Sequence, residues 1–283
     1  MLIDLHAHST ASDGTLTPAE LVAAAVDARL DVVAITDHDT TAGWAPAAQA
    51  LPAGLTLVPG AELSCRWYAV DPPIALHLLA YLFDPTSAEL VTALAEVREA
   101  RERRAERMVE LMRDDGLDVT FAEVRGYAGE GTVGRPHLAQ ALIRRGLAGT
   151  VGEAFAPHLL GERYRVPKED LDVFTAVRLV RAAGGVAVFA HPRATRRGRI
   201  VPDELIVALA EAGLFGLEAD HEDHSPQERE HVRGLASELG LVATGSSDFH
   251  GANKTVQLGA HTTGPEVYER IIAAATGHAP IRA

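Results

Sequence analysis

The stretch that decides the fold is the amino terminus, Met1-Leu-Ile-Asp-Leu-His-Ala-His-Ser-Thr-Ala-Ser-Asp-Gly14. Its apolar residues 2–5 predict a short buried strand. Side chains two apart on a strand point the same way, so His6 and His8 present both imidazoles at the end of this strand. Asp13 follows in a Ser/Gly loop that can fold back, adding a carboxylate oxygen to two nitrogens. The pattern predicts a metal site, although two chance surface histidines would look the same.

Composition narrows the classes of protein. The chain has 283 residues, 47% of them hydrophobic, which suits one large domain or a domain with an insertion. A net charge of -13 argues against broad contact with duplex DNA but leaves room for a small anionic substrate, since bound metal ions add positive charge. The single cysteine, Cys65, suits a reducing compartment. Because no signal peptide or membrane-spanning run is visible, we expect a cytoplasmic protein without membrane contact.

Strands and helices alternate, and polar side chains follow the strands. Residues 31–36 predict a buried strand that runs into Asp37-His38-Asp39, and residues 55–58 predict a third strand, followed by Glu62. In parallel α/β folds, ligands gather at the carboxyl ends of strands. We therefore expect His38 and Glu62 near the first histidine pair, although each alone would read as a loop residue.

The next apolar strand, residues 74–82, carries His77 in its first half. In a parallel strand this position would lie far from the other ligands. His77 is therefore either a core histidine or part of a strand that runs antiparallel to the previous one. The Pro72-Pro73 turn favours the antiparallel hairpin.

Strands disappear between residues 87 and 169, which predicts a helical insertion, or cap, within a domain formed by residues 1–86 and 170–283. Residues 89–113 predict one long helix with mixed charges on a solvated face. Gly134-Arg-Pro-His137 opens a later helix and places Arg135 at its amino terminus, where it can help to hold a phosphate. An ordinary capped helix is equally compatible, and the acidity of the chain disfavours a helix-turn-helix DNA reader.

After the insertion the alternation resumes, with strands at residues 186–190, 213–218 and 241–244. The first ends in His191, and the last leads to Asp248 and His250, which repeat the spacing of the first histidine pair. About seven strands interrupted by one insertion favour a barrel-like α/β domain over an open sheet.

Potential metal ligands thus follow six strands or hairpins. Nine ligands are too many for one ion, and two of them are acids that can bridge, so the set suits two or three divalent metal ions such as Mn, Fe or Zn. The candidate ligands are His6, His8, Asp13, His38, Glu62, His77, His191, Asp248 and His250.

The motifs resemble those of the PHP (polymerase and histidinol phosphatase) superfamily, in particular its stand-alone phosphoesterases of nucleotides or short RNA. They are Asp4-Leu-His-Ala-His-Ser9, Ile35-Thr-Asp-His-Asp-Thr40, Pro59-Gly-Ala-Glu-Leu-Ser64, Ala190-His-Pro192 and Gly245-Ser-Ser-Asp-Phe-His-Gly251. The resemblance implies a distorted (β/α)7 barrel with a helical insertion and three metal ions. Its implied ligand sets are His6, His8, Glu62 and Asp248; Glu62, His77 and His191; and Asp13, His38 and His250. The chain departs from the family at Glu218-Ala-Asp-His221, where relatives commonly read Glu-Val-Tyr-His.

The resemblance implies a metal-dependent phosphoesterase that acts on a small nucleotide, such as a nucleoside monophosphate or 3',5'-bisphosphate, or on the 5' end of a short RNA. Such an enzyme works through a hydroxide activated by metal ions. We expect Arg135 and His224 to be the catalytic groups, with His224 as a donor of a proton or of a hydrogen bond. The expected substrate-binding residues are Arg135, Arg193, His221 and His224. Histidinol-phosphate phosphatase, metal amidohydrolase and a catalytically silent nucleic-acid-binding module are the alternatives.

Overall fold

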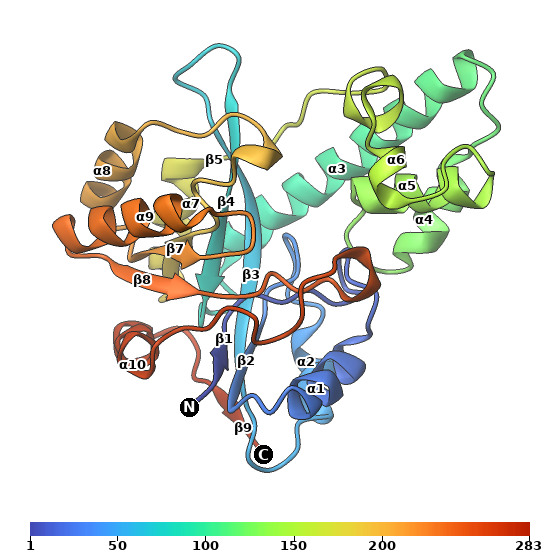
Figure 1. Cartoon of the computed structure of the whole chain (residues 1–283). Helices are drawn as coiled ribbons and strands as arrows, with labels where there is room; N and C mark the ends of the chain where they lie inside the picture. The colour runs from blue at the N-terminus through green and yellow to red at the C-terminus, as the bar shows by residue number, and fades with distance from the viewer.

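A single mixed sheet forms the centre of the molecule (Figure 1). The structure is a computed structural model that describes the whole chain, residues 1–283. Its main path has the order β1-β2-β3-β4-β6-β7-β8. These strands are Ile3–Asp4, Val32–Ile35, Thr56–Trp67, Ile74–Tyr81, Val186–Phe189, Gly216–Asp220 and Val242–Gly245. Two short strands, β5 (Leu171–Asp172) and β9 (Ile281–Arg282), pair with β3. A parallel bridge between Ala7 and Phe249 joins the two ends of the path. The sheet is nearly closed, which confirms the predicted barrel-like α/β fold.

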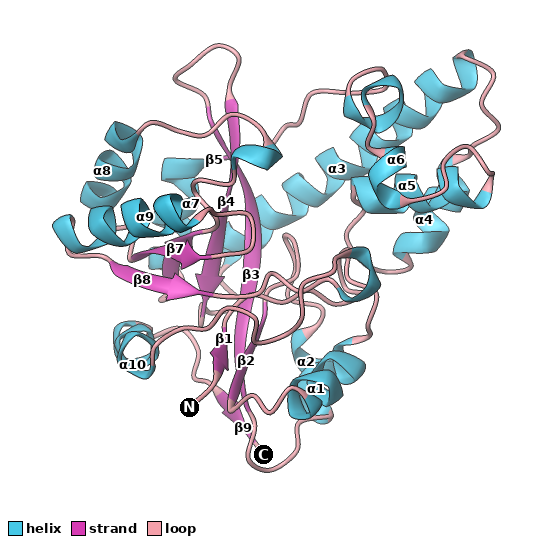
Figure 2. Ribbon diagram, viewed as in Figure 1, coloured by secondary structure: helices cyan, strands magenta, loops and turns pink.

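Helices surround the strands (Figure 2). They are α1 (Pro18–Asp27), α2 (Trp44–Gln49), α7 (Val173–Ala182), α8 (Asp203–Ala212), α9 (Pro226–Glu238) and α10 (Pro265–Ala274). Alternate residues of β2 face different parts of the core: Val33 and Ile35 join a cluster of 42 buried residues, whereas Val32 and Ala34 join one of 13. This alternation is the period of two expected for a strand buried on both faces. None of the helices combines the length and the apolar character that crossing a membrane requires.

The hairpin of β3 and β4 confirms the antiparallel arrangement favoured by the sequence, with Ser64 opposite His77. However, the prediction that the third strand ends before Glu62 is wrong. β3 pairs with β2 from Thr56 to Pro59 and continues along β4 as far as Trp67. Gly60 looks like a strand terminator, but it lets β4 approach: a Cβ there would lie 2.9 Å from the Ala80 carbonyl oxygen.

The region predicted as an insertion is helical and forms a lobe beside the sheet (Figure 1). Its elements are α3 (Ala88–Asp114), α4 (Phe121–Ala128), α5 (Arg135–Arg144), α6 (Val151–Ala154) and a π-helical turn, Pro157–Gly161. The lobe has its own cluster of 16 buried hydrophobic residues. Helix α3 belongs to both parts, since Leu90 and Leu94 pack into the main core and Met108 and Met112 into the lobe. The domain boundaries at residues 87 and 169 stay a prediction.

Candidate metal centre

The nine predicted ligands meet around one end of the sheet. They come from the segments after β1, β2, β6 and β8 and from the middle of β3 and β4. All are buried except His77, whose side chain is 18% exposed. Asp13 reaches the group because its loop folds back on itself: a Cβ at Gly14 would collide with the His8 carbonyl group. The structure therefore brings together side chains that lie far apart in the sequence.

Four of these side chains form a compact cage. The Nε2 atoms of His6 and His8 lie 3.1 Å apart, and each lies 3.1 to 3.4 Å from Glu62 Oε2 and Asp248 Oδ1. Four ligand atoms at tetrahedral bond lengths from an ion are about 3.3 Å from one another. In addition, Asp248 Oδ1 is buried and has no hydrogen-bond partner. The cage thus fits a divalent metal ion.

Two further groups adjoin this cage. One consists of His8, Asp13, His38 and His250, and the other of His38, Glu62 and His77. Their shortest contacts are 3.3 Å between His250 Nε2 and Asp13 Oδ1, and 2.7 Å between His77 Nδ1 and Glu62 Oε1. His191 Nε2 also lies 3.0 Å from Glu62 Oε1. These groups match the implied sets closely, with His8 and His38 each shared between two groups.

The electrostatics of the cage favour cations. Burial lowers the pKa of His6 and His8, but the carboxylates around them prevail. Asp248, Glu218 and Glu62 raise the pKa of His6 well above its ordinary value, and hydrogen bonds to Asp248 and Glu62 raise that of His8 to about 9. Despite their burial, Glu62 and Asp248 have pKa values well below the usual range, because positive neighbours stabilise their charged forms. The cage thus holds ionised carboxylates that call for positive charge.

The sequence analysis did not identify Glu218 as a supporting residue. Its side chain is fully buried, and the Nδ1–H of His6 donates to Glu218 Oε1 at 2.9 Å. The backbone N–H of His191 donates to the other oxygen at 2.8 Å. Because Nδ1 keeps its proton for Glu218, Nε2 is the nitrogen of His6 that would release a proton and bind a metal. The only signal was an acid followed by an unusually polar strand exit.

Two ligands have backbone conformations that are rare for residues with a side chain. The φ angles of His191 and Asp248 are 34° and 54°. Positive φ costs free energy at non-glycine residues, and such residues concentrate at functional sites. At both positions this backbone directs the side chain toward the cage.

The geometry argues against the prediction that His224 is a proton donor. Its Nε2 accepts a hydrogen bond from the Arg193 backbone N–H at 3.0 Å, and its Nδ1–H donates to the Ala219 carbonyl at 2.9 Å. Burial lowers the pKa of His224, which keeps the ring neutral. Both nitrogens are thus occupied by backbone groups, so His224 connects the loops after β6 and β7.

His221 contacts a ligand. Its Nδ1 accepts from the Asp223 backbone N–H at 3.0 Å, so its Nε2–H donates to Asp248 Oδ2 at 3.2 Å. This places His221 behind Asp248 as an orienting group. The neighbouring Asp220 forms an ion pair with Arg233 of α9.

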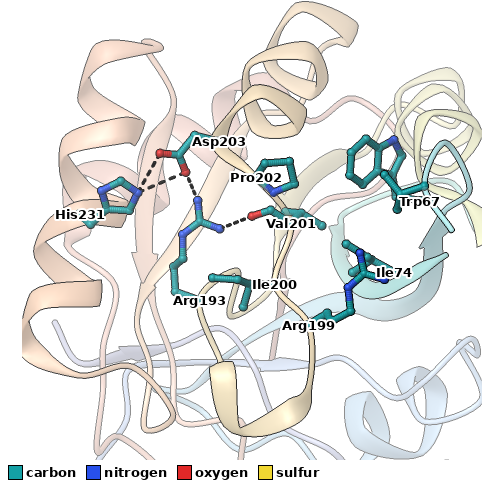
Figure 3. A pocket seen from close by; sticks show the side chains of 10 residues that line it. Trp67, Ile74, Arg193, Arg199, Ile200, Val201, Pro202, Asp203 and His231 are labelled. Carbon is teal, nitrogen blue, oxygen red and sulfur yellow. Dashed lines mark hydrogen bonds and ion pairs between the residues drawn. The ribbon is translucent and has the colours of Figure 1, made fainter. Parts of the chain in front are cut away.

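The structure also contradicts the prediction that Arg193 holds a substrate phosphate. Its guanidinium donates to the Val201 carbonyl at 2.8 Å and pairs with Asp203, and the residue is only 6% exposed (Figure 3). These groups line one side of a cavity of about 530 Å³, with Trp67 and Ile74 on the other side. The guanidinium is therefore committed to the start of α8.

The long helix α3 is less solvated than predicted. Arg98 donates to the Asp39 carbonyl at 2.7 Å, and Arg101 Nε lies 2.7 Å from Asp39 Oδ2. Asp39 in turn holds Ser64 of β3 through the Ser64 backbone N–H and hydroxyl. One face of α3 is thereby joined to the loop that carries His38.

Arg135 lies where the lobe meets the metal centre. A Cβ at the preceding Gly134 would be 3.9 Å from Asp13 Oδ2, and the Arg135 guanidinium lies 5.1 Å from the centre of the Phe155 ring. Burial together with the positive charges of Arg165 and Arg101 lowers the pKa of Arg135. Arg135 therefore belongs to a group of like charges that is half-buried except for the exposed Arg165.

We call this group the cation cluster. None of its members forms an ion pair with a carboxylate, although Arg104 donates to the Val166 carbonyl at 2.9 Å. The lack of carboxylate partners is unusual in a chain with a net charge of -13. The members are Arg104, Arg135, Arg165 and Lys168.

The sequence analysis missed two cations beside Asp248. Arg197 Nη2 and Lys254 Nζ each lie 2.6 Å from Asp248 Oδ2. Arg197 also reaches His191, because its Nη1 lies 3.1 Å from His191 Nε2. Burial and Arg197 lower the pKa of His191 to about 3, so this imidazole is neutral. Nothing in the sequence placed either cation near a strand end.

Comparisons with known proteins agree with this geometry. A family model for the PHP domain matches residues 4–119. The 5'-3' exoribonuclease Rnm of Escherichia coli is 33% identical over 263 residues, which cover 92% of this chain and 88% of the relative. The 3',5'-nucleoside bisphosphate phosphatase of Chromobacterium violaceum is 32% identical, with 88% and 87% covered.

A solved structure from Bifidobacterium adolescentis, described as a metal-dependent phosphoesterase, superposes with a TM-score of 0.89 at 35% identity and covers 97% of this chain and 96% of its own. The similarity therefore extends over nearly the whole chain, the barrel and the lobe together. On these grounds the chain belongs to the PHP domain family of phosphoesterases.

Proposed function

We propose that this phosphoesterase uses two or three divalent ions to hydrolyse phosphate esters of a small nucleotide, such as a 3',5'-bisphosphate, or of the 5' end of a short RNA. The observation that carries the proposal is the cage in which His6 and His8, from the amino terminus, face Glu62 of β3 and Asp248, which follows β8. Both relatives named above support it, since one is an exoribonuclease and the other a nucleotide phosphatase.

The residues of the cage suit this chemistry. Ions held there would lower the pKa of water toward neutrality and neutralise phosphate oxygens. Glu62 contributes one oxygen to each of two groups, which positions them side by side. Glu218 fixes the tautomer of His6, and His221 orients Asp248. Mixed His, Asp and Glu ligands accept Mn, Fe or Zn, and we propose one of these as the physiological metal.

The cation cluster supports a substrate with a second, non-reacting phosphate. Desolvated arginines without carboxylate partners form strong paired hydrogen bonds with phosphate. Gly134, which precedes Arg135, lies close to Asp13, since a Cβ there would be 3.9 Å from Asp13 Oδ2, so a nucleotide can extend from the metal centre toward the start of α5. A net charge of -13 makes duplex DNA a poor partner, and the buried Cys65 suits the cytoplasm.

A substrate screen tests the proposal. The purified chain would be loaded with Mn, Fe or Zn in turn and assayed on nucleoside monophosphates, 3',5'-bisphosphates, short 5'-phosphorylated RNAs and histidinol phosphate. We expect turnover of a nucleotide or an RNA 5' end. Preference for histidinol phosphate, or no turnover with any metal, would refute the proposal.

Substitution of Arg135 tests binding of the second phosphate separately from the reaction at the metal centre. Arg135→Ala should lower kcat/KM on a bisphosphate by about ten- to a hundredfold, because a charged hydrogen bond contributes roughly 1.5 to 3 kcal/mol. Arg135→Lys should restore little, since a point charge cannot form the paired contact. Metal content should be unchanged.

Two controls accompany this variant. On an aryl phosphodiester without a second phosphate, Arg135→Ala should lose much less activity than on the bisphosphate. Arg144→Ala, at the exposed end of the same helix, should lose no activity on either substrate. Equal losses on both substrates would place Arg135 on the reacting phosphate, and no loss would leave the lobe a structural cover.

A further inference from the structure

Three of the four arginines in the loop between β6 and α8 have partners in different directions. Arg193 is committed to Asp203, and Arg199 donates to the Pro72 carbonyl in the β3–β4 hairpin at 2.9 Å. Arg197 alone turns toward the metal centre, where it contacts Asp248 and His191. The side chain of Arg197 is 32% exposed, so it lies between the ligands and solvent.

The contact with His191 is incompatible with metal binding at the same atom. The Nε2 of a neutral imidazole has one lone pair, which can either accept a hydrogen bond or bind an ion. In the structure Nε2 lies 3.1 Å from Arg197 Nη1 and 3.0 Å from Glu62 Oε1: one tautomer accepts from the guanidinium and the other donates to the carboxylate, and in neither is the lone pair free. An ion that uses His191 must therefore displace the guanidinium from it.

Asp248 adds a second source of competition. Its Oδ2 already receives Arg197, Lys254 and the Nε2–H of His221, whereas Oδ1 faces the cage. A divalent ion on Oδ1 would be brought close to two cations on the same carboxylate. Repulsion between like charges favours release of the cation that has another partner.

Arg197 has such a partner. Its Nε lies 2.6 Å from Asp223 Oδ2, so this ion pair uses a different nitrogen from the contacts with His191 and Asp248. Rotation about this ion pair would free the two Nη atoms without moving the loop. A guanidinium with two free Nη groups beside metal ions is suited to paired hydrogen bonds with a tetrahedral phosphate.

We propose that Arg197 is a substrate-binding residue whose contacts with His191 and Asp248 compete with the metal ions, and which turns to the phosphate of the substrate when the ions bind. The proposal rests on the proposed function, because it requires a phosphate ester at this centre. It predicts opposite effects of one substitution: tighter metal binding and weaker phosphate binding.

The first test measures metal retention and needs no turnover. The full chain, loaded with Mn²⁺, would be challenged with a chelator as wild type, Arg197→Ala and Arg197→Gln. Both variants should lose Mn²⁺ more slowly, by about tenfold, because a competitor has been removed. Arg196→Ala, at the exposed neighbouring position, is the matched control and should match wild type. Faster loss in the Arg197 variants would overturn the proposal, since Arg197 would then be holding the ligands in place.

The second test uses inorganic phosphate as the probe. Arg197→Ala should weaken inhibition by phosphate about tenfold and raise KM more than it lowers kcat, with partial rescue in Arg197→Lys. Unchanged phosphate inhibition would overturn the proposal. If the wild type hydrolyses no phosphate ester, the proposed function fails, while the chelator test still reports on the competition.

Discussion

Asp248 connects the metal cage to the cations around it, so its removal should affect metal binding more than folding. Asp248→Ala should abolish turnover and reduce metal content, because it removes the oxygen that faces His6 and His8. Metal analysis of the purified variant, together with its circular dichroism spectrum, checks this. Asp220→Ala, which removes a carboxylate paired with Arg233 outside the cage, should keep its metal. Full metal content and activity in Asp248→Ala would mean that the ligand assignment is wrong.

His77 distinguishes a metal ligand from a core histidine. Its Nδ1 is buried, has no hydrogen-bond partner and lies 2.7 Å from Glu62 Oε1. We therefore expect His77→Ala to lose metal and most activity while the melting temperature of the chelated protein changes little. Retained activity with reduced stability alone would instead identify His77 as a structural residue.

For single residues, the sequence predicted which His, Asp and Glu side chains would meet better than it predicted the contacts of the residues around them. Ligands follow strands, and the spacing of His6 and His8 or of Asp248 and His250 is visible in the chain. The partner of an arginine is not, because it depends on contacts made after folding. Arg193 is the clearest case: it lies next to His191, yet its guanidinium pairs with Asp203.

At the scale of elements, the cation cluster beside the amino terminus of α5 should make substrate affinity depend on pH. The pKa of Lys168 is lowered to about 8. Burial is the main cause, and the positive charges of Arg101, Arg104 and Arg135 add to it, while Asp170 acts in the opposite direction. The amine is charged below this value and neutral above it. Affinity for a nucleoside 3',5'-bisphosphate should therefore fall as the pH rises through about 8.

Lys168→Arg should flatten that dependence, because a guanidinium keeps its charge over this range. The measurement is KM as a function of pH for both proteins, with the aryl phosphodiester as the control substrate. A wild-type profile with no fall in affinity, or one that Lys168→Arg reproduces, would show that Lys168 does not contact the substrate.

Most elements could be predicted, since helix caps and apolar runs are local signals. The capping box at Thr17 and Glu20 forms as the sequence indicates. The full length of β3 could not be predicted, because its second half is held by pairing with β4. In the sequence, the Pro59-Gly60 pair is instead typical of a turn. Likewise, α3 reads as a solvated helix until Asp39 is seen beside Arg98 and Arg101.

At the scale of the whole molecule, the metal centre joins strands that are distant along the sheet. Ligands from β3 and β4 meet those that follow β1, β2, β6 and β8, close to the bridge between Ala7 and Phe249. Ions bound there would hold the two ends of the sheet together. Without them, the buried carboxylates of Glu62, Asp248 and Glu218 rely on neighbouring histidines, Arg197 and Lys254 for positive charge, and the link that an ion adds between the strands is lost.

Removal of metal should therefore lower the melting temperature of the barrel. An ion present at a hundredfold excess over its Kd stabilises the folded state by about 2.7 kcal/mol. For a chain of this size, that corresponds to a shift of roughly 5 to 10 °C. Thermal unfolding in chelator and in increasing Mn²⁺ measures it, and a melting temperature independent of Mn²⁺ would contradict the prediction.

The destabilisation should not be uniform, because the lobe has its own cluster of 16 buried residues. Hydrogen exchange in chelator should increase most in the segments that carry ligands, around His6, His38, His191 and Asp248. It should increase little in α5, whose buried residues pack within the lobe. Equal increases in both parts would mean that the lobe and the barrel unfold as one cooperative unit, coupled through α3, which packs into both cores.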